Sequence, residues 1–562
     1  MKRREFIKKT ITTASLSFCS QIIKPNGFLE LAQGYDLQQS FNNPIDIRDP
    51  NPIQTLTWEQ FNSSDFNGDD ITRTHEALWN TDDYISKRGG IPSPTEYTDT
   101  VIVGGGCSGL LSAYYLQNRN PIILEQAGQF GGNSRGEYFN GQSPYSIGAA
   151  YITKPDLNSD CYRILYDLKL LPFARPEKST ESRVFFQNQF LKGFWEGNTD
   201  PQARKQFLLI NAKLEEILEK FYPDIPWSTE SALTRQQLLQ LDSMSFYTWL
   251  ISMFGNVHQH ILEYFQLYCW SSFGGSIDEI SAAQALNFLA AETDEILAFP
   301  GGNAAIAQAL YSYHYQRNGS SSVRAGALVL SVQINKNGVD ICYEGPDRKL
   351  YSIRANHCVL AAPKFIAKRI VKNMSEQQQR ACDAIEYRSY IVANLLIKKN
   401  HSIFSPCFEL YCLEGAVPPT PSALKPPNRP FTDICFGSWA YGDQGEIGVL
   451  SIYKALPYQG ARQFLFNPLS HNKHRQSLIE NSKTLIQQLG ITENQILGIR
   501  LTRWGHALPL AQTGALSQGF LEAANQTIDN KIFFANQDNW VNPSFETAVA
   551  AASEVANQIN SI

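Results

Sequence analysis

The sequence predicts an α/β protein in which a parallel-sheet domain alternates along the chain with a second, α+β domain. Residues 100–125 have the pattern of a buried strand, a Gly-x-Gly-x-x-Gly turn, a helix and another strand. Residues 531–560 add a buried strand and an alanine-rich helix. Residues 202–297 have mainly helical patterns, including a run over residues 277–297, and residues 324–453 have mainly strand patterns, with an Asn-Gly hairpin turn expected at residues 337–338. A chain of 562 residues exceeds the size at which one hydrophobic core stops growing, so two domains are expected.

Residues 100–125 have the parts of a dinucleotide-binding βαβ unit. Val101–Val103 is short, apolar and β-branched, as a parallel strand covered on both faces must be. Gly104 allows the tight turn, Gly106 lets a pyrophosphate approach the backbone, and Gly109 lets the helix pack against the strand. The N–H groups at the helix start face the phosphates, and a carboxylate ending the second strand accepts hydrogen bonds from a ribose. The predicted contacts are Gly104, Gly106, Cys107, Ser108, Gly109, Glu125 and Gln126.

A second glycine pair, in GGNSR at residues 131–135, indicates which dinucleotide is bound. An extended FAD needs a second loop along its pyrophosphate and ribityl chain, whereas NAD enzymes do not usually need one. Gly131 and Gly132 admit the phosphates, and Arg135 offers a forked donor to them. The alternative is a surface turn with a solvated arginine. The small residues at 146–150 offer a place for a flat ring system, and the predicted contacts are Gly132, Asn133, Arg135, Gly148 and Ala149.

The C-terminal segment supplies the other half of the predicted site. Asn542 as N-cap and Pro543 at the first helical position predict the start of the alanine-rich helix. The positive end of that helix would stabilise the negative edge of a reduced flavin. Asp538 is placed to hold ribityl or ribose hydroxyl groups. The alternative is a helix that only closes the sheet. The predicted contacts are Asp538, Phe545 and Thr547.

Taken together, these motifs resemble those of the flavin-containing amine oxidase superfamily, which includes phytoene-desaturase-like enzymes. The matching pieces are VIVGGGCSGL, GGNSRG, SIGAAY, AFPGGNAAIAQAL, SVQI with VLAAP, and FANQD with PSFETAVAAA. The resemblance implies a Rossmann-like FAD-binding domain of residues 96–155, 296–385 and 500–562, interleaved with a substrate domain of residues 156–295 and 386–499. It also implies that Val332 contacts the adenine through its backbone.

The chain departs from the family pattern at four places, one of which is Asn133, directly after the glycine pair, where the family has a basic residue. Many amine oxidases carry a lysine near the flavin on a substrate-domain strand, but the strand Ile391–Leu396 has none. Covalent attachment in monoamine oxidases uses a cysteine before the last FAD segment, and residues 503–538 contain no cysteine, so the FAD is expected to be noncovalent. Thr547 stands where the family has glycine. The chain is therefore not expected to be an orthodox monoamine oxidase.

Trp504 and His506 are the candidate catalytic residues. They precede the last FAD segment, where the family places aromatic residues against the flavin, and an imidazole has a pKa suited to proton transfer. A hydrogen-bonded structural role for His506 is the alternative. The expected activity is removal of a hydride from a C–N or C–C bond of a small hydrophobic substrate, with oxygen or another acceptor left open. The other readings are a non-redox FAD isomerase or binding protein and, less favoured, an NAD-dependent dehydrogenase.

The N-terminus predicts export. MKRREFIKK places Arg3 and Arg4 before an apolar stretch, as in a twin-arginine signal, so residues 1–30 are expected to address the protein to the twin-arginine translocase and the periplasm. Residues 31–95 are expected to form an irregular arm with a short helix near residues 72–78. No later segment has about 20 uninterrupted apolar residues, so no transmembrane segment is expected in the mature chain.

The bulk composition excludes some partners. The net charge of −5 gives no reason to expect nucleic acid as a partner. The ten cysteines show neither C-x-x-C pairs nor zinc spacing, so no metal site and no disulfide framework are expected, although Cys407 and Cys412 could pair.

Overall fold

The structure of the chain is a computed structural model. It describes residues 49–64, 66–69, 72–139, 144–177, 183–292, 295–399, 405–418, 431–443, 445–467 and 469–562. The predicted signal region of residues 1–30 lies outside these ranges.

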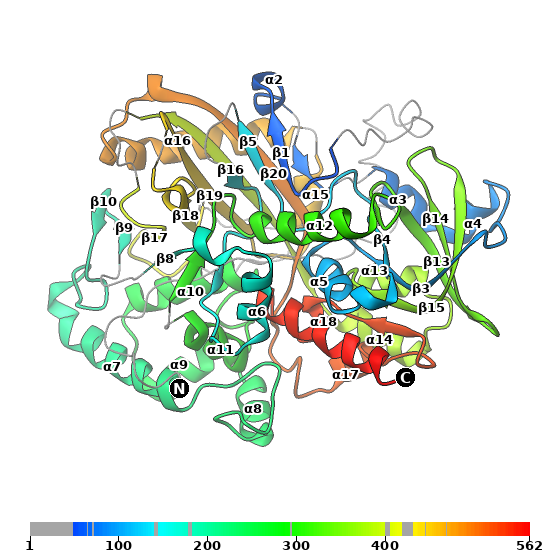
Figure 1. The fold of residues 1–562 in the computed structure, drawn as a ribbon. Coiled ribbons are helices and arrows are strands. Elements are labelled where there is room, and N and C mark those ends of the chain that lie inside the picture. The colour runs from blue at the N-terminus through cyan, green and yellow to red at the C-terminus, as the bar shows by residue number, and fades with distance from the viewer. Residues whose placement is uncertain are drawn as a thin grey trace.

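A mainly parallel sheet forms the centre of the first domain (Figure 1). Its strand order is β12-β4-β3-β15-β14-β13, and β21 pairs in parallel with the end of β15. The parallel strands are β12 (Val323–Arg324), β4 (Ile122–Leu124), β3 (Glu96–Val103), β15 (Leu350–Leu360) and β21 (Ile532–Phe534). The strands β13 (Leu328–Asn335) and β14 (Gly338–Glu344) form an antiparallel hairpin, and β14 pairs antiparallel with β15. The predicted Asn-Gly turn between β13 and β14 is confirmed.

Both faces of this sheet are covered, as the sequence of its first strand predicts. Ile102 lies in one hydrophobic cluster, together with residues of α5 (Cys107–Tyr115), α12 (Ala304–Asn318) and α18 (Phe545–Asn560). Val101 and Val103 lie in the other cluster, with residues of α13 (Lys364–Ile370). Alternate side chains of one strand therefore enter two cores.

The second domain is built on an eight-stranded sheet in the order β10-β9-β17-β18-β19-β16-β20-β2. In that order the strands are Gln189–Leu191, Val184–Phe186, Glu409–Leu413, Asp433–Phe436, Ile447–Leu456, Tyr387–Lys398, Ile496–Pro509 and Asn67–Gly68. The central strands β16, β19 and β20 are long and antiparallel. The residue-500 boundary predicted for the FAD-binding domain falls inside β20, which lies in this sheet.

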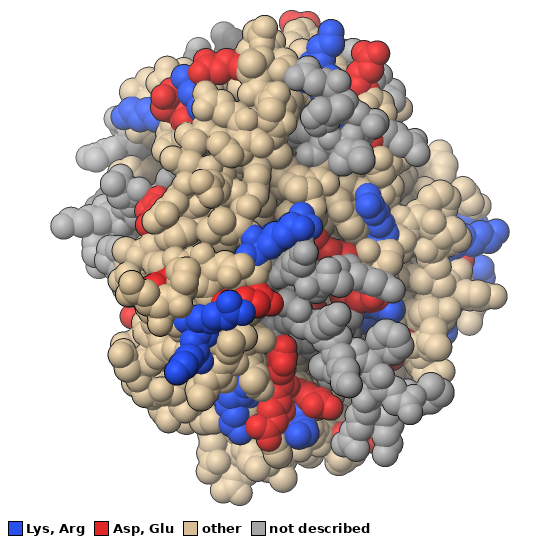
Figure 2. All heavy atoms as spheres, turned by 90° about the vertical axis from the view of Figure 1, so that its left-hand side faces the viewer, with Lys and Arg blue, Asp and Glu red and all other residues tan. Residues whose placement is uncertain are grey.

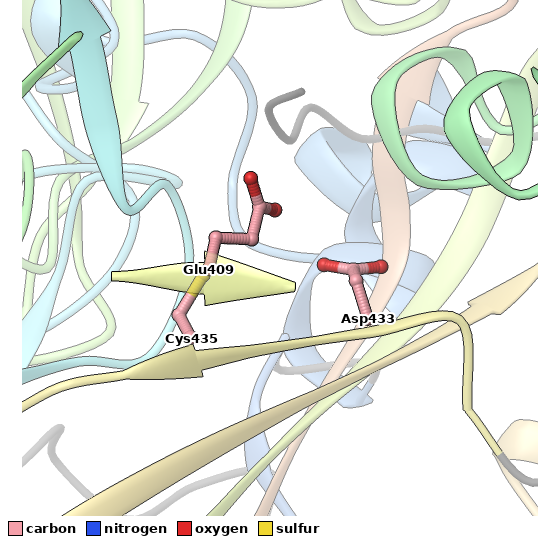
Figure 3. A group of neighbouring side chains, drawn as sticks. All are labelled: Glu409, Asp433 and Cys435. Carbon is pink, nitrogen blue, oxygen red and sulfur yellow. The ribbon is translucent and has the colours of Figure 1, made fainter. Parts of the chain in front are cut away.

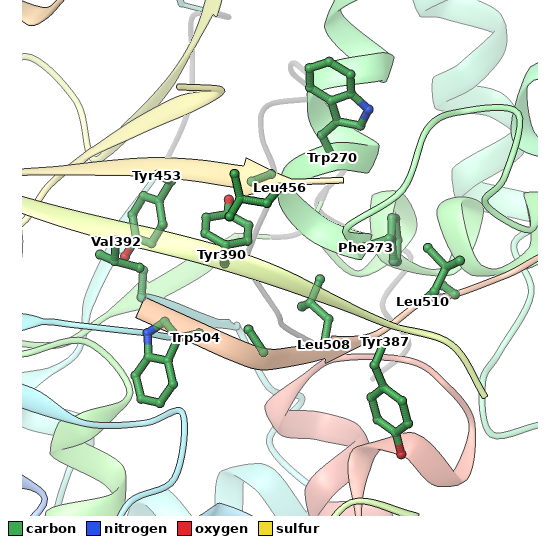
Figure 4. Packing of buried hydrophobic residues seen from close by; sticks show 14 of the residues in the cluster. Trp270, Phe273, Tyr387, Tyr390, Val392, Tyr453, Leu456, Trp504, Leu508 and Leu510 are labelled. Carbon is green, nitrogen blue, oxygen red and sulfur yellow. The ribbon is translucent and has the colours of Figure 1, made fainter. Parts of the chain in front are cut away.

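Helices cover the eight-stranded sheet and enclose an aromatic core (Figure 4). Trp270 and Phe273 of α10 lie close to the strands that carry Tyr390 and Tyr453. The helices of this region are α7 (Arg204–Lys220), α8 (Arg235–Asp242), α9 (Phe246–Phe254), α10 (Gln259–Phe273) and α11 (Ala282–Glu292). The helical pattern expected over residues 277–297 is shorter than predicted, because α11 ends at Glu292 and the strand β11 (Ile296–Ala298) follows.

Smaller elements complete the molecule. Two three-stranded sheets have the orders β1-β5-β6 and β7-β11-β8. Their remaining strands are β1 (Ile53–Leu56), β5 (Gly136–Phe139), β6 (Tyr145–Ser146), β7 (Tyr151–Thr153) and β8 (Arg175–Glu177). The remaining α-helices are α2 (Trp58–Phe61), α3 (Thr72–Trp79), α4 (Thr81–Ser86), α6 (Asp160–Asp167), α14 (Glu376–Ala384), α15 (Ala461–Leu465), α16 (Ser470–Gln488) and α17 (Phe520–Ala524).

The N-terminal arm is more ordered than the sequence predicts. The short helix expected near residues 72–78 is present as α3, but β1, α2, β2 and α4 also lie in the arm. At the other end of the chain, the N-cap of α18 is Ser544 and not Asn542, since the Ser544 side chain accepts a hydrogen bond from the Thr547 N–H.

Three further observations concern the surface and the cysteines. All nine cysteines in the part that the structure describes are free, so Cys407 and Cys412 do not form a disulfide. Among the described helices, none combines the length and apolar character that crossing a bilayer requires. On the face shown in Figure 2, positive and negative side chains are interspersed.

Candidate active site

A cavity of about 520 Å³ lies where the glycine-rich turns, the N-termini of α5 and α18, and helix α11 meet. Its volume is within the range of small-molecule and cofactor sites. Twelve of the residues singled out from the sequence line it: Gly104, Gly106, Cys107, Ser108, Glu125, Gln126, Gly132, Asn133, Ala149, His506, Phe545 and Thr547. The other six are not part of its lining: Gly109, Arg135, Gly148, Val332, Trp504 and Asp538.

The glycines after β3 shape one end of the cavity. Gly104 has a φ of +111°, which an L side chain rarely adopts. A Cβ atom on Gly109 would lie 1.8 Å from the Gly104 carbonyl oxygen, so Gly109 allows helix–strand packing without reaching the cavity. Gly106 is the N-cap of α5 and gives it no side-chain cap. The first N–H groups of α5 are therefore free to donate hydrogen bonds to the phosphate oxygens of a bound FAD, so the residues at this end of the cavity fit that cofactor.

Glu125 is buried and belongs to the same end of the cavity. Its Oε2 accepts a hydrogen bond from the Gly105 N–H at 2.7 Å, and its Oε1 accepts one from the Ala127 N–H at 2.8 Å. Burial raises the pKa of this carboxyl, and the two backbone hydrogen bonds oppose the rise. Each carboxylate oxygen keeps acceptor capacity for a ribose hydroxyl.

Val332, for which a backbone contact with the adenine is predicted, is not among the residues that line the cavity. Its carbonyl accepts a hydrogen bond from the Lys372 N–H at 3.0 Å. Ala327, Leu328 and Val329, at the beginning of the same strand region, line the cavity instead. A β-bulge between Val329 and Ser331 shifts the register of β13 against β14, and the sequence gives no signal for it.

Asp538 also lies outside the cavity wall, because it forms a buried ion pair. Its Oδ1 accepts a hydrogen bond from Lys364 Nζ at 2.9 Å, and its Oδ2 accepts one from the Lys364 N–H at 2.8 Å. Tyr387 donates its hydroxyl to the same carboxylate. Asn536 and Gln537, just before it, line the cavity. The partner Lys364 was not singled out from the sequence, since nothing local marks a contact across more than 170 residues.

Arg135 and Trp504 support the wall from behind. Arg135 Nε donates to the Gly132 carbonyl at 2.9 Å, and its guanidinium lies 4.6 Å from the centre of the Trp504 ring. Trp504 Nε1 donates to the Ile147 carbonyl at 2.7 Å. A Cβ atom on Gly148 would lie 2.1 Å from the Asn133 carbonyl oxygen. These three residues therefore hold the second glycine loop against residues 146–149.

The N-terminus of α18 forms the opposite wall. Thr547 donates its hydroxyl to the Asn542 carbonyl at 2.6 Å, which fixes the turn before the helix. Glu546 accepts a hydrogen bond from the Thr153 N–H at 2.8 Å and so ties this turn to β7. The helix directs its positive dipole end at the cavity, where an anionic ring edge would be stabilised.

His506 lines the cavity, but its imidazole is engaged. Its Nε2 lies 2.7 Å from Arg462 Nη1 and accepts that hydrogen bond, and its ring stacks on Phe365 at 4.5 Å between centres. Burial and the Arg462 charge hold the pKa of His506 well below its usual value. The imidazole is therefore neutral near pH 7, and proton transfer through Nε2 requires Arg462 to move.

Several cavity residues were missed from the sequence. The N-terminal arm contributes a group without local periodicity: Asp69, Thr74, His75, Leu78 and Trp79. The second domain contributes a mixed aromatic and polar group: Tyr222, Asp224, Ile225, Asn287, Phe288 and Ala291. Tyr151, which follows the SIGAA segment, also lines it. Among the residues named in this paragraph, only Tyr151 stood in a segment that the sequence had marked as part of the site.

Comparison with known proteins places the chain. The profile of the flavin containing amine oxidoreductases matches residues 107–560. The chain belongs to this family. It is 25% identical over 523 residues to Oxidoreductase PigB of Serratia sp. (strain ATCC 39006), covering 83% of this chain and 76% of that protein.

Solved structures show the same fold. Putrescine oxidase bound to putrescine superposes with a TM-score of 0.61 at 16% identity, covering 84% of this chain and all of that chain (100%). Cyclohexylamine oxidase from Brevibacterium oxydans IH-35A gives a TM-score of 0.57 at 15% identity, covering 83% of this chain and 99% of that chain. The predicted fold class is confirmed: a Rossmann-like FAD-binding domain with an α+β substrate domain.

The family membership confirms the predicted function class. The protein is an FAD-dependent oxidoreductase of the amine oxidase family. This sets aside the non-redox and NAD-dependent alternatives.

Proposed function

We propose that the protein oxidises a C–N bond of a small, largely apolar amine with a noncovalently bound FAD. The observation that carries this is the continuity of one cavity, which runs from the glycine turns to the N-terminus of α18 and on to α11. A dinucleotide at the glycine turns would place its far end beside the second domain. The substrate would therefore meet the flavin against Tyr151 and Phe288.

The residues of the chain would bind and orient the FAD and shield the substrate from water. The N-terminus of α5 and the glycine loop holding Gly132 would bind the pyrophosphate, and the N-terminus of α18 would stabilise negative charge on the ring. Bound FAD supplies the acceptor for a hydride from the carbon next to nitrogen. Phe288, Ile225 and Ala291 would exclude water from the substrate.

Two observations favour an amine substrate: a carboxyl group in the cavity wall, and the substrates for which similar solved structures are named. Asp224 brings a carboxyl group to the cavity beside Tyr222 and Asn287. An ammonium group would be attracted to it on entry. The similar structures include oxidases that are named for putrescine and cyclohexylamine. Phe288, Ile225 and Ala291 suit an apolar body attached to that nitrogen.

Noncovalent attachment of FAD is supported by the state of the cavity cysteine. Cys107 is the one cysteine along the described cavity wall. Burial raises the pKa of its thiol to about 11, and a neutral thiol is a poor nucleophile. Acid precipitation should therefore release the yellow flavin into the supernatant, whereas a yellow pellet would contradict noncovalent binding.

We also propose export through the twin-arginine translocase, on the strength of Arg3 and Arg4. Cell fractionation should find the protein outside the cytoplasm together with its flavin. Replacing both arginines with lysine should retain it in the cytoplasm, still loaded with FAD. Wild-type protein confined to the cytoplasm would contradict the proposal.

Anaerobic reduction tests the proposed reaction. The oxidised holoenzyme is mixed with putrescine, cyclohexylamine and a series of linear primary amines, and the visible flavin absorbance is followed. Amines with a hydrogen on the carbon next to nitrogen should bleach the flavin. tert-Butylamine, which lacks that hydrogen, should not. Bleaching by alkenes or alcohols in place of amines would overturn the assignment.

A further inference from the structure

A buried polar cluster lies on strands β17 and β18 of the eight-stranded sheet (Figure 3), and α10 packs against β17. Glu409 of β17 is directly opposite Cys435 of β18, and Tyr411 is directly opposite Asp433. Residues opposite one another on neighbouring strands share a face, so all four side chains point the same way. One oxygen of each carboxyl and the Cys435 sulfur lie within 4.8 Å of one another. We call Glu409, Asp433 and the neighbouring Glu292 of α11 the carboxyl cluster.

Few described groups balance the charge of Glu409 and Asp433. Within the described ranges, Glu409 and Asp433 take part in no ion pair. Glu409 Oε1, Asp433 Oδ2 and the hydroxyl of the fully buried Tyr411 have no hydrogen-bond partner among the described residues. A buried carboxylate without a partner is costly, and two adjacent buried carboxyls cannot both ionise. At least one of these two carboxyls is therefore expected to stay protonated near neutral pH.

The pKa values agree with a protonated carboxyl in this pair. Burial raises the pKa of Asp433 to about 7, and burial together with the neighbouring Asp433 raises the pKa of Glu409 well above its usual value. A pair that carries one proton still has one acceptor oxygen near neutral pH. Such a pair can receive a second proton without any charged side chain entering the core.

Tyr151 connects this cluster to the cavity. Tyr151 lines the cavity, and its hydroxyl lies 3.2 Å from Glu292 Oε1 and 3.5 Å from Glu409 Oε2. The next residues of β7 are tied to the start of α18 through the Thr153 and Glu546 contact. The Tyr151 hydroxyl therefore stands between the cavity, at the end near α18, and the carboxyl cluster.

We propose that Tyr151 and the carboxyl cluster form a proton relay that removes the proton released when the substrate is oxidised. The inference rests on the proposed function. In the step, the C–H bond breaks and its electron pair goes with the hydrogen to FAD, which is the oxidant. The N–H bond breaks, its proton passes to the Tyr151 oxygen, and the hydroxyl proton of Tyr151 passes to Glu409 or Glu292. A C=N bond forms in the substrate.

The relay is testable without any substrate, by hydrogen–deuterium exchange of the buried carboxyl proton. Infrared difference spectra of the holoenzyme in H₂O and D₂O should show a protonated-carboxyl band that Glu409→Gln and Asp433→Asn each remove or shift. In Tyr151→Phe the carboxyl proton that gives this band should exchange with deuterium at least about tenfold more slowly than in the wild type. That corresponds to a change of roughly 1.4 kcal/mol in the barrier. Tyr268→Phe is the matched control.

Tyr268 is suited to this control because its hydroxyl lies 3.2 Å from Glu292 Oε2 but does not line the cavity. In Tyr268→Phe the carboxyl proton should exchange at the wild-type rate. Wild-type exchange in Tyr151→Phe would overturn the relay, and so would a spectrum unchanged by both carboxyl variants. One divalent metal per purified chain, lost in Glu409→Gln, would also overturn it, because the cluster would then be a metal site.

Flavin reduction gives a second readout. With an amine that bleaches the wild-type flavin, Tyr151→Phe should slow reduction while retaining the full FAD content, and the loss should diminish as pH rises. An unchanged reduction rate would contradict the relay. If no amine bleaches the wild type, the proposed function fails, and the exchange experiment alone decides whether the relay exists.

Discussion

The carboxylate of Asp69 clamps the backbone at His506. Asp69 Oδ2 accepts hydrogen bonds from the His506 N–H at 3.1 Å and the Gly505 N–H at 2.8 Å. The strand β2 just before it pairs in parallel with Thr502 and Arg503 of β20. The N-terminal arm thereby becomes part of the wall that carries His506.

Asp69→Ala should therefore weaken both the fold and the site. Two buried N–H groups would lose their acceptor, which costs about 1–3 kcal/mol each when unsatisfied. We expect a lower thermal unfolding midpoint and weaker FAD retention, measured by calorimetry and by flavin release on dialysis. Asp69→Asn keeps one acceptor oxygen and should fall in between. Full FAD retention in the alanine variant would show that the clamp does not shape the site.

Gly106→Ala separates cofactor binding from folding. The backbone φ at Gly106 is −74°, and the nearest atom to an added Cβ is Gly132 Cα at 3.6 Å, which is an ordinary contact. The apoprotein should lose at most about 1 kcal/mol, the usual range for an N-cap change. FAD affinity should fall at least about tenfold, because the methyl group would stand where the pyrophosphate approaches.

Titration of apoprotein with FAD, followed by fluorescence, measures this effect. Unfolding of the apoprotein in denaturant provides the control. An alanine variant that binds FAD as tightly as the wild type would mean that the phosphates lie elsewhere.

The elements found from the sequence are those in which local pattern and tertiary environment agree. Val101–Val103 is apolar on both faces and lies between two cores, and the turn at residues 337–338 joins β13 to β14. Two residues predicted to contact the cofactor are not part of the cavity lining and have long-range partners. The Val332 carbonyl accepts a hydrogen bond from the Lys372 N–H, and Asp538 is bound by Lys364.

The N-terminal arm contains cavity residues that could not be predicted from the sequence. Asp69 lies in a polar segment with little periodicity, and the pairing of β2 with β20 just before it brings it to the cavity. Glu409 and Asp433 also gave no sign of a shared site in the sequence, because each is the one charged residue of its strand. Their proximity follows from strand register, which a single sequence does not reveal.

His506→Gln should have a modest effect on flavin reduction. Its Nε2 accepts from Arg462, and the lowered pKa of the imidazole makes it a weak base. The rate should fall by less than about tenfold, below the 10²–10⁴ that general acid–base catalysis contributes. Stopped-flow reduction of the holoenzyme measures it. A loss of about a thousandfold with FAD retained would restore His506 as the catalytic base.

The buried carboxyls should make stability depend on pH. Folding raises the pKa of Asp433 to about 7, so its neutral form is favoured in the folded state. The contribution is fully present below the unfolded pKa of about 3.9 and is lost as pH rises to about 7. We expect a loss of about 1–4 kcal/mol in unfolding free energy between these values, attributable to this group.

Denaturant unfolding of the wild type and Asp433→Asn at several pH values measures the difference. The asparagine variant should show a smaller loss between pH 4 and pH 7. Asp529→Asn, at an exposed turn, is the control and should follow the wild type. Parallel curves for the wild type and Asp433→Asn would contradict a raised pKa at Asp433.

The ion pair between Lys364 and Asp538 should be strongly coupled. Both side chains are buried, and Tyr387 and Asn539 complete their hydrogen bonds. Lys364→Met alone would leave a buried carboxylate without its cation, a change that typically costs about 3–5 kcal/mol. Lys364→Met with Asp538→Asn removes both charges and should recover much of that loss. A double-mutant cycle on the unfolding free energy measures the coupling, and additive effects of the two substitutions would show that the pair is not held together as the structure indicates.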